Sequence, residues 1–351
     1  MPVFTFSPSR DRIAKFGALA FWLSSFPTFA VDIPFSGGAA ELQQAINDAP
    51  ENATIVCDSK RRLVISKTIF IKKAITLKGL TARLPEKLGR TQMIVVEAEG
   101  VTLSGIELHG NYKTVSQDDR APLIWLQKSR FTIEGCKFYD ATKDGIMVTP
   151  IDGAGDIVGG SIRDIEAFRM GRDAVSISGG NKGEKVRNVT VENVRLKVGY
   201  LRGAVEVSDG TDNITVRDVY AEDARYAIDV QDHKGDSAAN TNIVIEDVEA
   251  VNCRHIIRTA NSSRGHANPT LRNFTGRNCE SPVQISNTKN VTIEGLKLEC
   301  KSDSKSPPIN LRNCQGVSLR KVVIHGLPKA VEAVRKSGCK DVKIEGLSRR
   351  L

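Results

Sequence analysis

Ten copies of one short motif run along this 351-residue chain. Each copy reads small residue or Asn, apolar, Thr-like, apolar, any residue, Asn, Asp or Gly, apolar, as in NVTVENV at 188. The copies begin at residues 100, 130, 159, 188, 213, 242, 268, 290, 316 and 341. A period of 22–30 residues is typical of a solenoid, and the apolar–polar alternation is that of a β-strand.

A second set of strand-like segments follows the first set. These segments begin at residues 145, 174, 204, 227, 256, 282 and 308. Two short strands per coil cannot bury their apolar faces alone, so successive coils must stack as parallel sheets. We therefore predict an all-β fold, a right-handed parallel β-helix of about ten coils with a Val/Ile/Leu interior. Asn188, Asn213, Asn242 and Asn290 share one repeat position, where Asn tolerates a left-handed turn and can form an amide ladder.

The amino-terminal region predicts two further features. Residues 1–30 read as a secretory signal peptide: Arg10, Arg12 and Lys15 precede the apolar run 16–26, and Ala30 ends a small-residue cleavage pattern. A membrane anchor is the alternative, but this run is too short to span a bilayer. Residues 36–49 have the spacing of an amphipathic helix that caps the first coil. We thus expect a secreted or periplasmic protein whose residues 31–351 form one domain.

Charge and cysteine content limit the partners and cross-links. Lys plus Arg minus Asp plus Glu is 50 − 41 = +9, which favours polyanionic partners. Aromatic residues are only 5% and no RNP-like motif occurs, which argues against nucleic acid. We expect a monomer that binds an acidic polysaccharide without inserting into a membrane. Cys253 and Cys279 are stacked in adjacent coils, as are Cys314 and Cys339, and either disulfides or free thiols fit this spacing.

The chain resembles the pectin-lyase-like superfamily of right-handed parallel β-helices over roughly residues 36–349. The resemblance rests on AELQQAINDAP at 40, the NVTV-type repeats, DGI at 144 and DAVSISGGN at 173. It implies the fold and a carbohydrate-related function. The superfamily includes lyases, hydrolases, epimerases, esterases, phage tail proteins and non-catalytic proteins, so the fold alone selects no activity.

Aligning the second strands predicts which side chains share an outward column. One column holds Met147, Ser176, Glu206, Asp229, Arg258, Gln284 and Asn310. Another, two positions before each strand, holds five cations: Lys143, Arg172, Arg202, Arg225 and Arg254. Like charges about 4.8 Å apart repel. This column therefore favours a groove for carboxylate- or sulfate-bearing sugars, with Lys143, Arg172, Arg202, Arg258 and His266 as substrate-binding residues. The alternative is that each cation pairs with a neighbouring acid.

Acidic residues cluster in two adjacent coils. Glu206 and Asp229 share one column position, and Asp209 and Asp232 share another. Oxygen-rich clusters of this kind bind Ca²⁺, so these four carboxylates form a candidate calcium site. Pairing with nearby arginines, and a turn role for Asp209 and Asp232, are the alternatives. His233 and Lys234 follow the cluster directly, and His266 lies in the loop SSRGHAN, where we expect it to reach over the groove.

The reaction we expect is β-elimination in an acidic polysaccharide. A cation neutralises the substrate carboxylate, and a base removes the neighbouring proton. Superfamily lyases that this chain resembles use Arg or Lys as the base. The catalytic candidates are Arg225, Arg254, His233, Lys234 and Asp229.

Two alternatives remain. KDGI at 143 and RDAVSISGGN at 172 resemble the polygalacturonase pattern, which implies an inverting glycoside hydrolase, but the expected Gly-His-Gly is replaced by Leu201-Arg202-Gly203. Glu206 and Asp229 are another possible acid pair for hydrolysis. A non-catalytic β-helix that binds or scaffolds a polysaccharide is the third interpretation.

Overall fold

The computed structural model describes residues 31–114, 119–233, 238–260, 264–301 and 303–350. The predicted signal peptide, residues 1–30, lies outside the described residues, as does Lys234. Residues 31–351 form one unit. Within the described part of the chain, no helix is long and apolar enough to cross a membrane.

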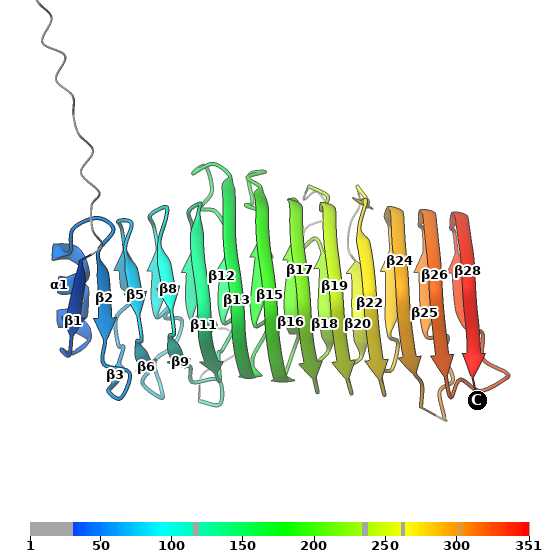
Figure 1. Cartoon of the computed structure of the whole chain (residues 1–351), viewed down its shortest axis with the longest axis horizontal. Helices are drawn as coiled ribbons and strands as arrows, with labels where there is room; N and C mark the ends of the chain where they lie inside the picture. The colour runs from blue at the N-terminus through cyan, green and yellow to red at the C-terminus, as the bar shows by residue number, and fades with distance from the viewer. Residues whose placement is uncertain (1–30, 115–118, 234–237, 261–263, 302, 351) are drawn as a thin grey trace, which may run out of the picture. The chain divides into compact units, whose positions relative to one another are not determined.

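The described residues build two parallel sheets whose strands stack coil upon coil (Figure 1). The larger, sheet A, has seventeen strands and the smaller, sheet B, has eleven. Sheet A contains β1 (Asp32–Phe35), β2 (Thr54–Cys57), β3 (Arg62–Val64), β5 (Thr76–Lys78), β6 (Thr81–Arg83), β8 (Thr102–Ser104), β9 (Glu107–His109), β11 (Phe131–Tyr139), β13 (Ile157–Met170), β15 (Val186–Gly199), β17 (Thr211–Glu222), β19 (Thr241–Val251), β21 (His266–Ala267), β22 (Thr270–Arg277), β24 (Thr288–Glu299), β26 (Gln315–His325) and β28 (Lys340–Arg350). Sheet B contains β4 (Ile69–Ile71), β7 (Ile94–Val96), β10 (Ile124–Leu126), β12 (Ile146–Val148), β14 (Val175–Ser178), β16 (Gly203–Ser208), β18 (Tyr226–Gln231), β20 (His255–Ala260), β23 (Val283–Ser286), β25 (Ile309–Arg312) and β27 (Val334–Ser337).

The fold is the all-β, right-handed parallel β-helix that the repeats predict, with about 12 turns. The ten motif copies begin only at residue 100. The additional turns come from the coils before that residue, where shorter strands such as β2, β4 and β5 replace the motif. The motif therefore predicts too few coils, because the strands before residue 100 stack without repeating the motif sequence.

The helix α1 (Ala39–Asp48) lies against the first coil (Figure 1). It buries Leu42 and Ile46. The side chain of Gln43 joins the helix to β4, because its Nε2 donates to the Phe70 carbonyl at 3.0 Å and its Oε1 accepts from the Phe70 amide at 2.7 Å. This contact confirms the predicted capping helix, within the 36–49 range, and supplies partners to one exposed strand edge.

Strand alternation holds on sheet B as predicted. Val205 and Val207 on β16, and Ile228 and Val230 on β18, are at most 1% exposed and belong to the core. The residues between them form the predicted outward column, since Ser176, Glu206, Asp229, Arg258, Gln284 and Asn310 pair in register from coil to coil. The strand period therefore determines which side chains are stacked on the outer face.

The repeated Asn residues form the predicted turns. Asn188, Asn213, Asn242 and Asn290 have φ between 53° and 57°, in the left-handed region that Asn tolerates. The side-chain amide of Asn213 donates to Asn188 at 2.7 Å, and that of Asn290 donates to Asn268 at 3.0 Å. These bonds satisfy polar side chains at a corner where every coil bends.

The seven cysteines are free thiols. Cys253 and Cys279 are buried, and burial raises the pKa of these thiols to about 11 and about 12. A thiol that stays protonated is a poor nucleophile. Both residues pack in the core as small apolar groups. The free-thiol alternative of the sequence analysis therefore describes this structure.

Candidate active site

A cleft of about 590 Å³ lies over strands β12, β14 and β16 of sheet B. The turns that follow these strands form part of its wall, including residues 179–183. Its charged lining consists of Lys143, Asp144, Arg172, Lys182, Glu206, Asp209, His233 and Arg264. Acids, cations and a titratable imidazole therefore meet in one concave surface, which is the usual arrangement of a binding or catalytic site.

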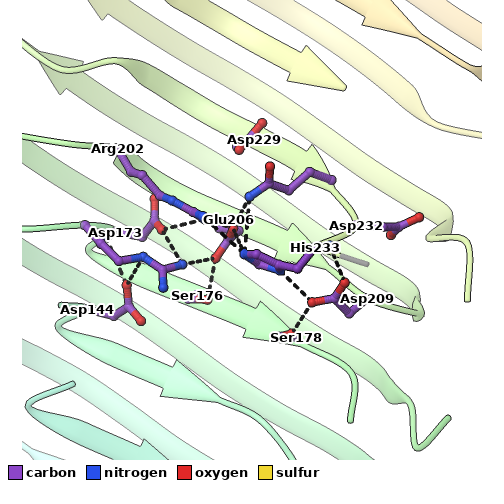
Figure 2. A network of polar contacts seen from close by, with 12 residues as sticks. Asp144, Asp173, Ser176, Ser178, Arg202, Glu206, Asp209, Asp229, Asp232 and His233 are labelled. Carbon is purple, nitrogen blue, oxygen red and sulfur yellow. Dashed lines mark hydrogen bonds and ion pairs between the residues drawn. The ribbon is translucent and has the colours of Figure 1, made fainter. Parts of the chain in front are cut away.

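Glu206 is the centre of the network in this cleft (Figure 2). It projects outward from β16 but is fully buried by its neighbours. Arg202 Nη1 contacts its Oε1, and Arg172 Nη2 donates to its Oε2 at 3.2 Å. Ser176 Oγ and Gln231 Nε2 donate to the same carboxylate at 2.8 and 2.6 Å. Burial acts to raise the pKa of Glu206, but Arg202 and Arg172 outweigh it and hold the pKa below its usual value.

His233 lies beside Glu206 and is oriented by Asp209. Its Nδ1 donates to Asp209 Oδ2 at 2.6 Å. Its Nε2 lies 3.4 Å from Glu206 Oε1 and 3.2 Å from Arg202 Nη2, from which the neutral ring accepts a hydrogen bond. Asp209 Oδ1 also accepts the His233 amide at 2.7 Å, and Asp209 Oδ2 accepts Ser178 Oγ at 3.0 Å. The hydrogen bond to Asp209 is the largest cause that raises the pKa of His233 above its usual value, with Glu206 contributing. Arg202 opposes protonation of the ring, but the two carboxylates outweigh it, so the imidazole is well placed to take up a proton.

Asp144 and Asp173 lie on the other side of Glu206 (Figure 2). Both are fully buried. Asp144 Oδ1 accepts the Asp173 amide at 3.2 Å, and Asp173 Oδ1 accepts the Gly203 amide at 3.2 Å. Burial raises the pKa of Asp173, and the nearby carboxylates of Glu206 and Asp144 raise it further. The buried carboxylates of Asp144 and Asp173 thus form ion pairs that hold Arg172 and Arg202 in place.

Asp229, a predicted catalytic residue and calcium ligand, is not part of the cleft lining. It is fully buried, and Arg258 binds it through Nε at 2.8 Å and Nη2 at 2.6 Å. Arg258 also lies over the ring of Tyr226, with its guanidinium carbon 4.9 Å from the ring centroid. Burial raises the pKa of Asp229 despite this contact. The pair fills its own place in the column, so Arg258 is turned toward Asp229 rather than toward a substrate.

The five-cation column divides into two groups. Lys143 and Arg172 line the cleft, and Arg202 supports it through Glu206. For Arg172 and Arg202 the pairing alternative is confirmed, since both contact buried carboxylates. Arg225 and Arg254, two of the catalytic candidates, are exposed and line no part of this cleft, so the structure does not bring them together with His233. Asp229, the buried acid of their coils, is already taken by Arg258, and Arg254 lies 3.7 Å from Glu280 instead.

His266 also differs from its prediction. It is 1% exposed, its Nε2 lies 3.2 Å from the Ala260 carbonyl, and its Nδ1 lies 3.2 Å from Asn240 Nδ2. Burial lowers its pKa, so it stays neutral. The loop presents Arg264 to the cleft and turns His266 inward, because His266 pairs with β24 as part of β21. The sequence places both residues in the loop SSRGHAN, and a loop has no strand period from which to predict which side chain faces outward.

The four predicted calcium ligands do not converge. Glu206 is held by Arg172 and Arg202, Asp209 by His233, and Asp229 by Arg258. Asp232 accepts from Asn240 Nδ2 at 2.9 Å and stands apart from the network of dashed contacts in Figure 2. Among the described residues, no group of three or more His, Cys, Asp or Glu side chains is arranged to hold a metal ion. These carboxylates therefore do not fit a calcium site in this arrangement, and calcium stays an untested prediction.

No protein-family model and no curated protein sequence matches the chain. Solved structures do match it. The N-terminal fragment of bacteriophage Phi29 gene product 12 is 16% identical, with a TM-score of 0.69 over 88% of this chain and 63% of that fragment. The family 28 exopolygalacturonase of Yersinia enterocolitica is 12% identical, with a TM-score of 0.59 over 91% of this chain and 76% of the enzyme. The alginate lyase of Paenibacillus sp. str. FPU-7 is 12% identical, with a TM-score of 0.52 over 90% and 99%.

This chain has the pectin-lyase-like parallel β-helix fold. The resemblance in the sequence is thereby confirmed for the architecture. Identities of 12–16% show the fold alone, and the chain spans less than two thirds of the phage fragment. The function must therefore be argued from the cleft itself.

Proposed function

We propose that the cleft binds an acidic polysaccharide and cleaves it by β-elimination, with His233 as the base. The observation that carries this proposal is the position of His233 between Asp209, 2.6 Å from Nδ1, and Glu206, 3.4 Å from Nε2. The side chain is 37% exposed, so a bound sugar can approach it. The imidazolium that forms on proton transfer is stabilised by both carboxylates.

The reaction needs a proton, an electron pair and a leaving group to be accounted for. His233 Nε2 takes the proton from the carbon next to the substrate carboxylate. The electron pair of that C–H bond forms a carbon–carbon double bond between C4 and C5, and the bond between C4 and the glycosidic oxygen breaks. The departing oxygen takes up a proton from solvent water, and the His233 imidazolium releases its proton to solvent. The products are one chain with a new reducing end and one with an unsaturated uronate.

Cations in the cleft support a carboxylate-bearing substrate. Arg172 lines the cleft, and its planar guanidinium donates to Glu206 on the cleft floor at 3.2 Å. Lys182 and Arg264 also line it and, within the described residues, form no ion pair. Neutralising the substrate carboxylate makes the neighbouring proton more acidic, which is the step on which elimination depends. Lys143, 4.0 Å from Asp144 Oδ2, is a further contact for the polymer.

The comparisons support carbohydrate chemistry in general terms. Two of the matching structures are described as an exopolygalacturonase and an alginate lyase. Both names refer to enzymes whose substrates are polysaccharides. An extracellular substrate would also agree with the secretory segment predicted for residues 1–30.

The test is a screen of acidic polysaccharides followed by absorbance of the unsaturated product. On the best substrate, His233→Gln should lower kcat/KM by about 100-fold or more, as expected when a general base is removed. His325→Gln is the matched control, since His325 lies on β26 of sheet A, away from the cleft lining. His325→Gln should keep the wild-type melting temperature, and His233→Gln should remain folded, with a loss of stability confined to pH values below the folded pKa of His233. If His233→Gln keeps activity within a few-fold, His233 is not the base.

The reaction product separates the alternatives. Reducing ends without unsaturated uronate would indicate hydrolysis, for which the raised pKa of Asp173 is the supporting observation. Asp173 is fully buried and does not line the cleft, which argues against its contact with substrate and ranks hydrolysis second. Binding without any product would indicate a scaffold. A chelator arm in the same assay tests the calcium prediction, since a metal-dependent enzyme would lose activity.

A further inference from the structure

A second groove, of about 360 Å³, lies beyond the cleft toward the carboxyl-terminal coils. We call it the lysine groove. Its polar side chains are Arg264, Asn287, Lys289, Asn313, Gln315 and Lys340. Among the described residues that line it there are three cations and no carboxylate. The cleft, in contrast, balances its cations against Asp144, Glu206 and Asp209.

The lysine groove adjoins the cleft. Arg264 lines both hollows. Backbone hydrogen bonds hold the walls that follow it, because His266 donates to the Asn287 carbonyl at 3.0 Å and Asn287 donates to the Arg312 carbonyl at 2.9 Å. Asn313 donates in turn to the Ser337 carbonyl at 2.8 Å. The groove therefore runs along turns that are fixed by the same stacking as the coils.

Charge in the lysine groove is uncompensated. Lys289, Gln315 and Lys340 occupy one register position in three successive coils. The two lysines are thus about 9.6 Å apart, with an amide between them. No ion pair involves Arg264, Lys289 or Lys340 within the described part of the chain. Cations arranged in this way repel one another and attract a chain with repeated negative charge.

We infer that the lysine groove holds the acidic polysaccharide where it leaves the cleft. This inference rests on the proposed function for the identity of the polymer, and it adds that the polymer carries anionic groups on several sugars beyond the cleavage point. Lys289 and Lys340 bind carboxylate or sulfate groups, and the amides of Asn313 and Gln315 bind hydroxyls. A substrate charged only at the cleavage site would gain nothing from this groove.

The test compares two double variants that remove the same charge. Lys289→Gln with Lys340→Gln changes the groove. Lys67→Gln with Lys78→Gln changes two exposed lysines in the first coils that form no ion pair among the described residues. Dissociation constants are measured at low salt for a long acidic polysaccharide and for a tetrasaccharide made from it. The groove variant should bind the long polymer about tenfold more weakly or worse, because a second contact on one chain is lost. Its affinity for the tetrasaccharide should not change.

A third double variant covers the other exit from the cleft. Arg312 and Arg335 line a separate groove of about 360 Å³ farther along sheet B. If Arg312→Gln with Arg335→Gln weakens polymer binding and the groove variant does not, the polymer leaves along sheet B and the inference is overturned. Equal losses in the groove variant and the Lys67/Lys78 control would also overturn it, since only net charge would then matter.

Failure of this inference differs from failure of the proposed function. A protein that binds the polymer through Lys289 and Lys340 but releases no unsaturated product contradicts the elimination chemistry and keeps the groove. A protein that cleaves the polymer while the groove variant binds like wild type contradicts the groove alone. Melting temperatures of all three double variants check that each is folded.

Discussion

The outer faces of the two sheets carry charge in opposite ways. On sheet A one column alternates in sign through nine successive coils: Glu134, Arg163, Glu192, Arg217, Glu246, Arg272, Glu294, Arg320 and Glu345. Every cation there lies between two carboxylates, at the spacing where opposite charges stabilise a parallel sheet. On sheet B the corresponding column places Glu206 directly beside Asp229, and both are fully buried.

This difference separates structural charge from functional charge. The alternating column is satisfied within the fold and gives a ligand nothing to bind. The outward column of sheet B instead places one buried acid, Glu206, beside another, Asp229, and the cations from Lys143 to Arg254 precede its strands. Such an arrangement costs stability unless the surrounding structure or a ligand compensates, and it is typical of functional sites.

The largest expected effect on stability comes from the centre of the sheet B network. Glu206→Gln leaves Arg172 and Arg202 facing a neutral amide in a buried site, and it should lower the free energy of unfolding by about 3–5 kcal/mol. Glu246→Gln, at the alternating column, removes a half-buried carboxylate paired with Arg272 and should cost about 0.2–1 kcal/mol. Urea denaturation of both variants measures the difference. Equal losses would mean that the two faces do not differ as described.

The next effect concerns pH. Asp209→Asn removes the main cause of the raised pKa of His233. A base acts in its neutral form, so wild-type kcat/KM should rise with pH, and the midpoint of this acid limb should lie above pH 6.5. In Asp209→Asn the midpoint of the acid limb should move to lower pH by up to about one unit. Because the pKa of His233 is raised in the folded state, the protonated imidazole stabilises the fold. This contribution is fully present below pH 6.5 and is lost as the pH rises through the pKa of His233 in the folded protein. The wild-type melting temperature should therefore fall in that window, and that of Asp209→Asn should not.

The control for the pH experiment is Ser178→Ala. Ser178 Oγ donates to Asp209 Oδ2 at 3.0 Å but does not contact the imidazole in the network of Figure 2. The acid limb of its pH–rate profile should stay close to that of wild type. An unchanged limb in Asp209→Asn would contradict the assignment of Asp209 as the residue that orients and charges His233.

The smallest expected effect lies on the alternating column. Arg272→Ala removes the cation between Glu246 and Glu294, which lie two coils apart and are each partly accessible to water, so the loss should be only about 0.2–1 kcal/mol. Polysaccharide binding should not change at all. The measurement is urea denaturation at low and at high salt, and the loss should shrink with added salt. A decrease in polymer affinity would show that sheet A also faces the substrate.

Sequence periodicity alone determined the repeat architecture and the columns. An apolar–polar alternation at a nearly constant period leaves one way to bury the Val and Ile side chains, and stacking then dictates which residues lie above one another. That is why the repeat period by itself predicts the register of Ser176, Glu206, Asp229 and Arg258. The capping helix follows from the same logic, since its apolar spacing differs from that of every strand.

Only the tertiary structure decided which members of a column face a ligand. Register gives the order of side chains but not their rotamers or the depth of the turns around them. Arg258 could turn toward Asp229 or toward solvent, and Arg264 and His266 could exchange places in their loop. The fold decides both choices, placing Arg258 on Asp229 and Arg264 in the cleft. Long side chains and turns are set by three-dimensional neighbours, because burial and ion pairing depend on contacts between coils that no single repeat contains.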